Sequence, residues 1–195
     1  MLVWVVGAGG LLGSAVSASA QSGGAELFAS REIPWTDPSA AQEALASELE
    51  RFRASTTSEP WAIAWCAGSS IVASTNEQTT VELQTLSAFV NGIRQERPTG
   101  PGVFFLASSA GGVYAGSDDP PFSVASTPRP VSPYGALKLA QEQVVTEALS
   151  GVVNVVIGRL SNLYGPRTDS RKGQGLVPSL CRATVHRAPL NLYVS

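Results

Sequence analysis

A tyrosine and a lysine four residues apart are the side chains of this sequence best placed to act together chemically. Tyr134 and Lys138 follow a proline-rich loop and stand at the head of a predicted helix. On a helix, this spacing puts both side chains on one face. A free phenol titrates near pH ~10, too high for a good acid or base at neutral pH, and a neighbouring ammonium favours its ionised form. Many helices carry such a pair on a solvated face, so its meaning depends on the surrounding elements.

A glycine-rich turn near the N-terminus is the first of those elements. Residues 2–6 form a short apolar run that predicts a strand buried on both faces of a parallel sheet. Gly7, Gly10 and Gly13 follow with G-x-x-G-x-x-G spacing, and residues 14–20 predict a helix. Such glycines permit a tight turn and a close approach of backbone to a pyrophosphate, while the helix N-terminus attracts phosphates. The alternative is a turn that only packs. We favour a dinucleotide site made by Gly7, Gly10, Leu11, Leu12 and Gly13.

Two later segments suggest where such a cofactor would lie. Arg31 follows a predicted strand over residues 26–30, where an NAD enzyme usually has a carboxylate for the ribose 2′-hydroxyl. An arginine there suits a 2′-phosphate, which slightly favours NADP over NAD, although a solvated loop arginine is nearly as good an interpretation. Another buried strand ends at Cys66, Ala67 and Gly68. These small residues would let a cofactor pass close to the backbone.

The remaining elements alternate between buried strands and helices. This alternation predicts an α/β fold, a doubly wound parallel-sheet Rossmann domain. Predicted helices cover residues 38–54, 76–96 and 134–150, predicted strands cover residues 61–66, 103–107 and 152–157, and a stub of a third strand is predicted at residues 33–35.

Composition excludes several other classes of protein. The chain has 195 residues, 44% hydrophobic and 14% charged, with a net charge of −2 and so no basic footprint for nucleic acid. No apolar run reaches the ~20 residues of a membrane span, and the N-terminus lacks the basic region of a signal peptide. Cys66 and Cys181 form no CxxC or Cys/His cluster, so we expect no metal site and a reducing, cytoplasmic setting. His186, the single histidine, is expected to be a surface or packing residue.

Five motifs in order link the tyrosine, the glycines and the strands. They are Gly7/Gly10/Gly13, then Cys66-Ala67-Gly68, then Ser108-Ser109 with Val113-Tyr114, then Ser132-Pro133-Tyr134-Gly135 with Lys138, and finally the run from Arg159 to Pro166, which is expected to follow the sixth strand. In this order the sequence resembles the extended short-chain dehydrogenases/reductases, the NAD(P)-dependent epimerase/dehydratase group that acts largely on nucleotide sugars. The resemblance covers positions 2 to about 190.

The resemblance implies roles for individual residues. Tyr134 would exchange a proton with a substrate hydroxyl or carbonyl, and Lys138 would hold the nicotinamide ribose and favour the phenolate. Ser109 would hydrogen-bond the same substrate oxygen, with Ser108 beside it, and Asn162 would contact a nucleotide-sugar. Aligning backward from Val113-Tyr114 would put Ala110 in the place of Ser109.

The sequence also departs from the family pattern. An Asn common on the helix before the fifth strand is absent, with Thr79 and Thr80 in that region. The Asp-Glu pair that a dehydratase commonly needs is replaced by Ala110-Gly111, which favours an epimerase or reductase. Family members usually run to about 300 residues, so residues 1–165 are interpreted as the Rossmann domain and residues 166–195 as only the start of a substrate lobe. A helix and a strand are expected between Leu176 and Tyr193.

Several functional alternatives stay open at this point. The chain is interpreted as an NAD(P)-dependent enzyme of nucleotide-sugars, either a piece of a longer enzyme or a short protein with an open site. A non-catalytic NADP-binding sensor or partner subunit is the main alternative, and a reductase of a non-sugar carbonyl is a weaker one. Arg159 and Asn162 are compatible with a nucleotide diphosphate without requiring one. The resemblance also allows a homodimer.

Overall fold

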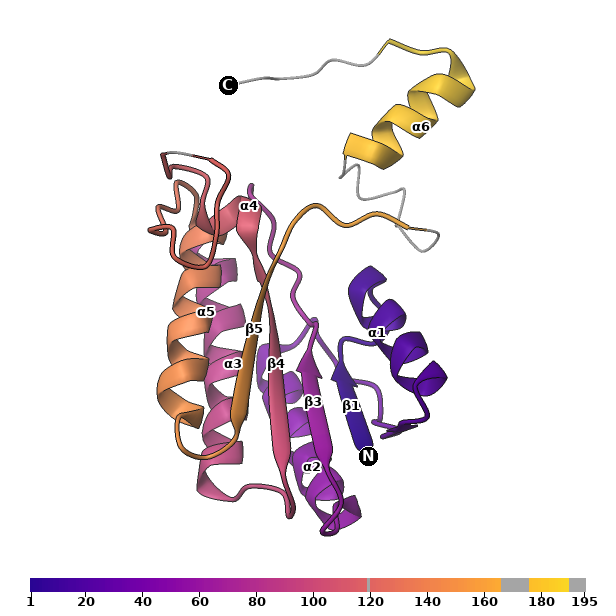
Figure 1. Cartoon of the computed structure of the whole chain (residues 1–195), viewed down its shortest axis with the longest axis vertical. Helices are drawn as coiled ribbons and strands as arrows, with labels where there is room; N and C mark the ends of the chain where they lie inside the picture. The colour runs from indigo at the N-terminus through magenta and orange to yellow at the C-terminus, as the bar shows by residue number, and fades with distance from the viewer. Residues whose placement is uncertain (119, 166–175, 190–195) are drawn as a thin grey trace.

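The central element of the computed structural model is a parallel sheet of five strands in the order β2-β1-β3-β4-β5 (Figure 1). The structure describes residues 1–118, 120–165 and 176–189. The strands are β1 (Leu2–Val6), β2 (Glu26–Leu27), β3 (Trp61–Trp65), β4 (Gly102–Ser109) and β5 (Asn154–Leu160). The chain leaves β1 toward one edge to form β2 and then crosses to the other side for β3. Ligands of open α/β sheets bind at such a switch point, at the carboxyl ends of the strands.

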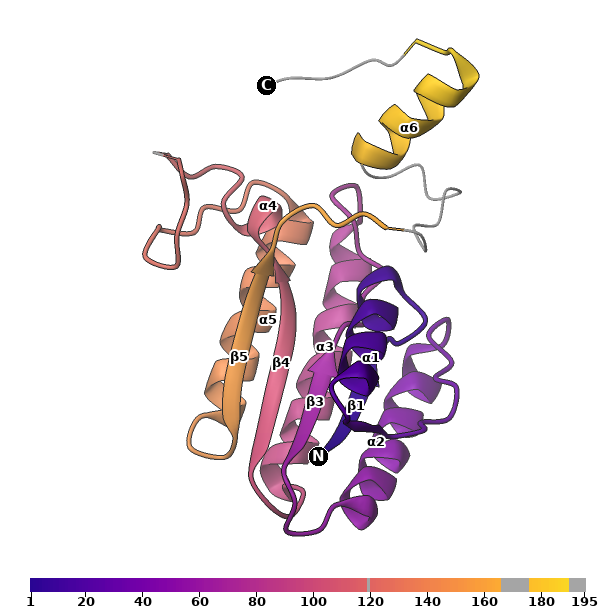
Figure 2. The same ribbon diagram turned by 45° about the vertical axis from the view of Figure 1, so that its right-hand side comes forward.

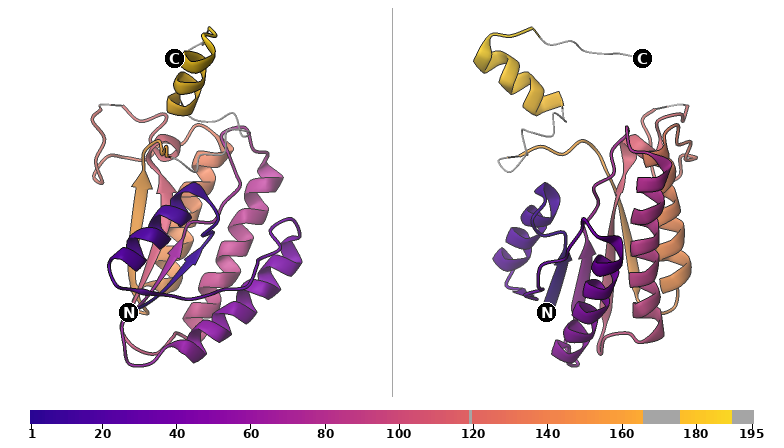
Figure 3. Two further views of the ribbon diagram at one scale, coloured as in Figure 1. Left: turned by 90° about the vertical axis from the view of Figure 1, so that its right-hand side faces the viewer. Right: turned by 180° about the vertical axis from the view of Figure 1, so that it is seen from behind.

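Helices cover the two faces of the sheet unequally (Figures 1 and 3). One face carries α2 (Pro38–Ser55), α3 (Asn76–Gln95) and α5 (Pro133–Leu149), and the other carries α1 (Leu11–Ser22) over β1 and β2. The short α4 (Ala110–Val113) follows β4 directly. The last helix, α6 (Leu176–His186), lies away from the sheet in the views of Figures 1 and 2. This arrangement is the doubly wound Rossmann fold that the sequence predicted.

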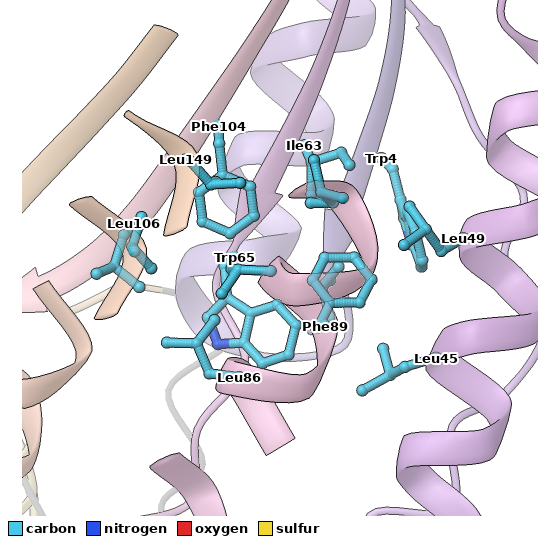
Figure 4. Packing of buried hydrophobic residues seen from close by; sticks show 14 of the residues in the cluster. Trp4, Leu45, Leu49, Ile63, Trp65, Leu86, Phe89, Phe104, Leu106 and Leu149 are labelled. Carbon is cyan, nitrogen blue, oxygen red and sulfur yellow. The ribbon is translucent and has the colours of Figure 1, made fainter. Parts of the chain in front are cut away.

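Aromatic and aliphatic side chains pack together in the core between the sheet and the three helices (Figure 4). Trp4, Trp61 and Trp65 are fully buried, and the ring of Trp4 lies edge-on to the ring of Phe89 at 5.2 Å. Helix α2 closes one side of this core with Phe52 and two leucines. Since β1 and β3 supply the tryptophans, the core fixes the two strands that flank the switch point.

Local capping signals explain where two of the covering helices begin. Asp37 caps α2, and its carboxylate accepts hydrogen bonds from the backbone N–H groups of Ser39 and Ala40. Thr75 and Gln78 form a capping box at the start of α3. Such caps satisfy backbone donors that have no partner inside the helix.

The strand stub predicted at residues 33–35 is wrong. This segment forms turns instead, with Trp35 N–H donating to the Ile33 carbonyl at 2.9 Å. Pro34 has no N–H to donate in a sheet ladder. Just before this segment, the backbone N–H of Arg31 donates to the Glu48 carboxylate at 3.0 Å. Strand β2 ends after two residues, before the predicted end at Ser30, and the Ser30 N–H donates within its own segment to the Phe28 carbonyl at 3.0 Å.

Other boundaries differ by smaller amounts. Strand β5 runs from Asn154 through Arg159 to Leu160, so the predicted post-strand motif begins inside the strand. Helix α1 begins at Leu11, three residues before the prediction. The strand expected at residues 190–193 and Pro166 of the last motif lie outside the described residues. None of the helices in the described ranges combines the length and the apolar character that a membrane-spanning segment needs.

Candidate cofactor and catalytic site

Close backbone packing defines the glycine turn after β1. Gly7 has φ +87°, and a Cβ on it would lie 2.7 Å from the backbone nitrogen of Ala67. A Cβ on Gly13 would lie 2.1 Å from the carbonyl oxygen of Gly7. Helix α1 therefore packs directly on the turn. Gly10 is its N-cap and supplies no side-chain acceptor, so the first N–H groups of the helix, around Leu11 and Leu12, are available to a phosphate.

Three cavities follow one another along the carboxyl ends of the strands. The arginine cavity, of about 270 Å³, is bounded by Gly7, Gly9, Ser30, Arg31 and Trp35. The glycine cavity, of about 290 Å³, is bounded by Gly7, Gly10, Trp35, Gly68 and Glu82. The tyrosine cavity, also of about 290 Å³, is bounded by Leu12, Cys66, Ala67, Gly68, Ser70, Ala107, Ser108, Ser109, Tyr134, Lys138, Leu160, Ser161, Asn162 and Leu163. Adjacent cavities share lining residues.

The tyrosine cavity thus brings together most of the residues singled out from the sequence. Tyr134, Lys138 and Ser109 meet Asn162 there, although they come from α5, β4 and the segment after β5. Cys66, Ala67 and Gly68 border both the tyrosine and the glycine cavities. Arg31 lies in the arginine cavity instead, at the other end of the series.

The start of α5 sets the position of Tyr134. Ser132 caps the helix by accepting a hydrogen bond from Gly135 N–H at 3.1 Å. A Cβ on Gly135 would lie 2.3 Å from the carbonyl oxygen of Gly112, so α5 and α4 pack backbone to backbone. Tyr134 is half-buried, and the Nζ of Lys138 lies 5.7 Å from the centre of its ring. Within the described part of the chain, no hydrogen bond engages the Tyr134 hydroxyl.

The two neighbouring serines differ in their surroundings. Ser109 Oγ caps α4 by accepting from Gly112 N–H at 3.1 Å, which leaves its own proton to donate. Ser108 is buried, and its hydroxyl donates to the Glu142 carboxylate at 2.5 Å. Ala110, the alternative to Ser109, lines a separate cavity.

Lys138 is buried beside a carboxylate and an amide. Its Nζ donates to Gln141 Oε1 at 3.0 Å and lies 3.7 Å from Glu82 Oε1. Burial lowers the pKa of the Lys138 ammonium from its ordinary value, and the negative charge of Glu82 opposes part of that change. Burial also raises the pKa of the Cys66 thiol to about 11, so this cysteine is a neutral wall residue at neutral pH.

Arg159 does not line the tyrosine cavity. Its guanidinium makes a bidentate ion pair with Glu142, with Nη2 at 2.6 Å from Oε2, and it also donates to the Tyr114 hydroxyl. These partners hold the pKa of Arg159 above its usual range, the hydrogen bond to Glu142 contributing most. The arginine therefore fastens β5 to α5.

Sequence reasoning missed two residues at these cavities. Glu82 falls in the buried register of α3 with Thr79, Leu86 and Phe89, and a carboxylate in that register was the available signal. Trp35 borders two cavities with 47% of its surface exposed. Because this residue was predicted to lie in a strand, the sequence did not indicate a place at a cavity. Over residues 1–118, 120–165 and 176–189, no group of three or more His, Cys, Asp or Glu side chains could hold a metal ion.

Solved structures with this fold include several enzymes of nucleotide-sugars. The Thermus thermophilus UDP-glucose 4-epimerase, in complex with NAD, matches with a TM-score of 0.74 and 22% identity, over 97% of this chain and 64% of its own. MoeE5 in complex with UDP-glucose and NAD matches at 0.72 and 23%, over 100% and 64%. RMD from Pseudomonas aeruginosa, complexed with NADPH, matches at 0.68 and 20%, over 87% and 56%. The chain thus spans somewhat under two thirds of the length of these proteins.

Family membership comes from the sequence as a whole. No curated protein matches the chain. The profile of the NAD dependent epimerase/dehydratase family matches residues 3–194 of the 195. The glycine turn, the parallel sheet and the series of cavities at its carboxyl edge agree with this match. The chain belongs to the NAD-dependent epimerase/dehydratase family.

Proposed function

We propose that this chain carries the cofactor site and the catalytic residues of an NAD(P)-dependent epimerase or reductase that acts on a nucleotide-sugar. One observation carries the proposal. Tyr134, Lys138 and Ser109 line a single cavity with Asn162, and that cavity shares its wall with the cavity at the glycine turn. A cofactor laid across the turn would therefore present its reactive end to the tyrosine.

The backbone around the turn fits a dinucleotide. Alanine at Gly7 or Gly13 would collide with backbone atoms, so the turn is compact, and α1 offers uncapped N–H groups where a pyrophosphate would lie. When bound, the nicotinamide would accept or return a hydride at a substrate carbon. Lys138 would hold the nicotinamide ribose through its ammonium.

The hydroxyl groups of the cavity would manage the proton that accompanies the hydride. Hydride transfer at a carbon requires a proton partner on its oxygen. The Tyr134 hydroxyl, which lines the cavity, would exchange this proton, and the Ser109 hydroxyl would orient the same substrate oxygen. Asn162, which also lines this cavity, would contact the nucleotide-sugar.

We further propose a preference for NADP over NAD. Arg31 and Ser30 line the arginine cavity together with Gly9 of the turn, and 72% of the Arg31 side chain is exposed. Its Nε lies 3.9 Å from Glu48, a distance at which the guanidinium can still turn toward a 2′-phosphate. Among related folds, RMD was solved with NADPH and the UDP-glucose 4-epimerase with NAD, so this class accommodates both cofactors.

An epimerase or reductase fits better than a dehydratase. Ala110 and Gly111 follow Ser109, and neither supplies the carboxylates that dehydration would need. MoeE5 was solved with UDP-glucose and with UDP-glucuronic acid, which makes UDP-sugars the first substrates to screen.

Calorimetric titration with NADPH and NADH is the first experiment. We expect NADPH to bind more tightly, and Arg31→Ala to reduce its affinity toward that of NADH. Preference for NADH would refute the role of Arg31 but not the cofactor site.

Turnover of UDP-, GDP- and dTDP-sugars by the chain and by Tyr134→Phe then tests the chemistry. The substitution is expected to abolish turnover and leave cofactor affinity nearly unchanged. Turnover that survives in Tyr134→Phe would refute the acid–base role, and cofactor binding without turnover would favour a non-catalytic NADP-binding protein.

A further inference from the structure

The carboxylate of Glu82 connects two parts of the site that are far apart in the sequence. Its Oε2 accepts hydrogen bonds from the backbone N–H groups of Ser69 and Ser70, at 3.1 and 3.0 Å. Its Oε1 lies 3.7 Å from Lys138 Nζ and accepts from Gln141 Nε2 at 3.2 Å. One side chain of α3 thus contacts both the loop after β3 and the lysine of α5.

Gly68 makes room for this contact. A Cβ on Gly68 would lie 2.8 Å from Glu82 Oε1, so any other residue would displace the carboxylate or the loop. The loop borders both the glycine and the tyrosine cavities. Glu82 therefore lies beneath the loop along which the proposed cofactor would run.

The lysine depends on this carboxylate for its charge balance. Both side chains are largely buried, with 8% of Lys138 and 12% of Glu82 exposed. An ammonium removed from water is costly unless a partner charge or hydrogen bonds compensate. Gln141 supplies a neutral oxygen, and Glu82 supplies the negative charge.

We propose that Glu82 is a positioning residue for Lys138. The Glu82 carboxylate keeps the lysine charged and ties its ammonium to the cofactor-facing loop. This role rests on the proposed function for its biological meaning, but it is a property of the free protein. It would make the loop and the lysine a single unit that meets the nicotinamide ribose from two sides.

Groups from every neighbouring element bear on the charge of Lys138. Helix α3 contributes Glu82, α5 contributes Tyr134, and the end of β3 contributes Cys66, which is neutral. The nearby Glu142 is engaged by Ser108 and Arg159. Among the described residues, Glu82 is therefore the acidic group paired with this lysine.

The competing interpretation is that Glu82 only braces the loop. Loop bracing depends on two accepted hydrogen bonds, whereas the proposed role depends on a full negative charge. The two interpretations are separated by the proton affinity of Lys138, which bracing alone would not change.

Trace acetylation of the cofactor-free chain with acetic anhydride measures that affinity. Only the free amine reacts, so the extent of Lys138 acetylation across the pH range, quantified by peptide mass spectrometry against an added amino acid, gives the midpoint of its titration. Glu82→Gln should lower this midpoint by roughly 1–3 pH units, the effect of losing an opposite charge at this distance. At a pH below both midpoints, each pH unit by which the Glu82→Gln midpoint is lowered gives the variant about tenfold more free Lys138 amine than the wild type.

Two further variants keep the test decisive. Glu82→Ala removes the same charge without adding a second amide, so it must move the midpoint in the same direction. Glu96→Gln is the matched control, because Glu96 follows the same helix and pairs with Arg53 at its far end. It removes one negative charge and should leave Lys138 unchanged. A midpoint that is the same in the wild type and both Glu82 variants, or a Lys138 that never reacts, would overturn the proposal.

Adding NADPH or NADH to the acetylation separates this proposal from the proposed function. Protection of Lys138 by cofactor is expected if the lysine holds the ribose. A shifted midpoint without protection would retain the role of Glu82 and refute the cofactor contact. Protection of Lys138 without a shifted midpoint would retain the cofactor contact and refute the role of Glu82.

Discussion

Replacing Gly13 by alanine tests the close packing of α1 against the glycine turn. The new Cβ would lie 2.1 Å from the carbonyl oxygen of Gly7, 2.7 Å from its carbonyl carbon and 2.9 Å from the Cα of Ala8. All three are backbone atoms, so no side-chain rotation can relieve the overlap. The helix must move away from the turn, or the turn must open.

Two opposing effects determine the size of the change. Alanine is favoured over glycine inside a helix by about 1 kcal/mol. Overpacking costs about 1–3 kcal/mol, and three backbone contacts shorter than 3.0 Å at Gly13 justify the upper end. The net loss is therefore about 2 kcal/mol. For a chain of this length, that corresponds to a fall in Tm of about 4–8 °C.

Gly9→Ala is the matched control, since Gly9 lies in the same turn and a Cβ on it would meet nothing within 4 Å. Its Tm should stay constant or rise slightly, because alanine restricts the unfolded chain. Thermal unfolding followed by circular dichroism measures both variants. A Gly13→Ala protein as stable as Gly9→Ala would refute the packing argument.

Three further predictions concern the support around the site. Asp37→Ala removes the acceptor that caps α2 and should lower the free energy of unfolding in urea by about 1 kcal/mol. Burial alone would raise the pKa of Glu48, but hydrogen bonds from Arg51 and the Arg31 backbone, with both positive charges, hold it below its usual value. Glu48 therefore stabilises the fold above its unfolded pKa, and this contribution is lost as the pH falls through its lower folded pKa. Glu48→Gln should unfold in urea more easily at neutral pH and differ less from wild type in acid. Trp35→Ala should weaken calorimetric NADPH affinity about tenfold if the indole stacks on the adenine.

Local signals were sufficient for most of the fold. The apolar runs of β1, β3 and β4 and the Asp37 cap each identify an element within a few residues of chain, so the order of strands and helices followed. The segment 33–35 was misjudged because a strand also needs a neighbour to pair with. The backbone of this segment instead bonds to itself, with Trp35 N–H donating to the Ile33 carbonyl.

Glu82 illustrates what could not be predicted from the sequence. On a helix with mixed polarity, a glutamate is usually solvated, and the register that Glu82 shares with Thr79, Leu86 and Phe89 does not by itself identify the groups it contacts. The absence of a side chain at Gly68 leaves room for this carboxylate. Its charge partner, Lys138, lies on another helix and 56 positions further along the chain. The motif residues gave the site its chemistry, but the charge partner of the lysine required the packed helices.

The positions of the tryptophans determine which part of the molecule tryptophan fluorescence reports on. All four tryptophans lie within the first 65 residues, and three of them, which belong to β1 and β3, are buried in the core. Their indole N–H groups have no hydrogen-bond partner within the described residues, so their emission should be at short wavelength, whereas the half-exposed Trp35 emits at longer wavelength. Strands β4 and β5 and helix α5 contain no tryptophan. Tryptophan fluorescence would thus report mainly on events at the glycine turn, and events around Tyr134 would need a tryptophan introduced there.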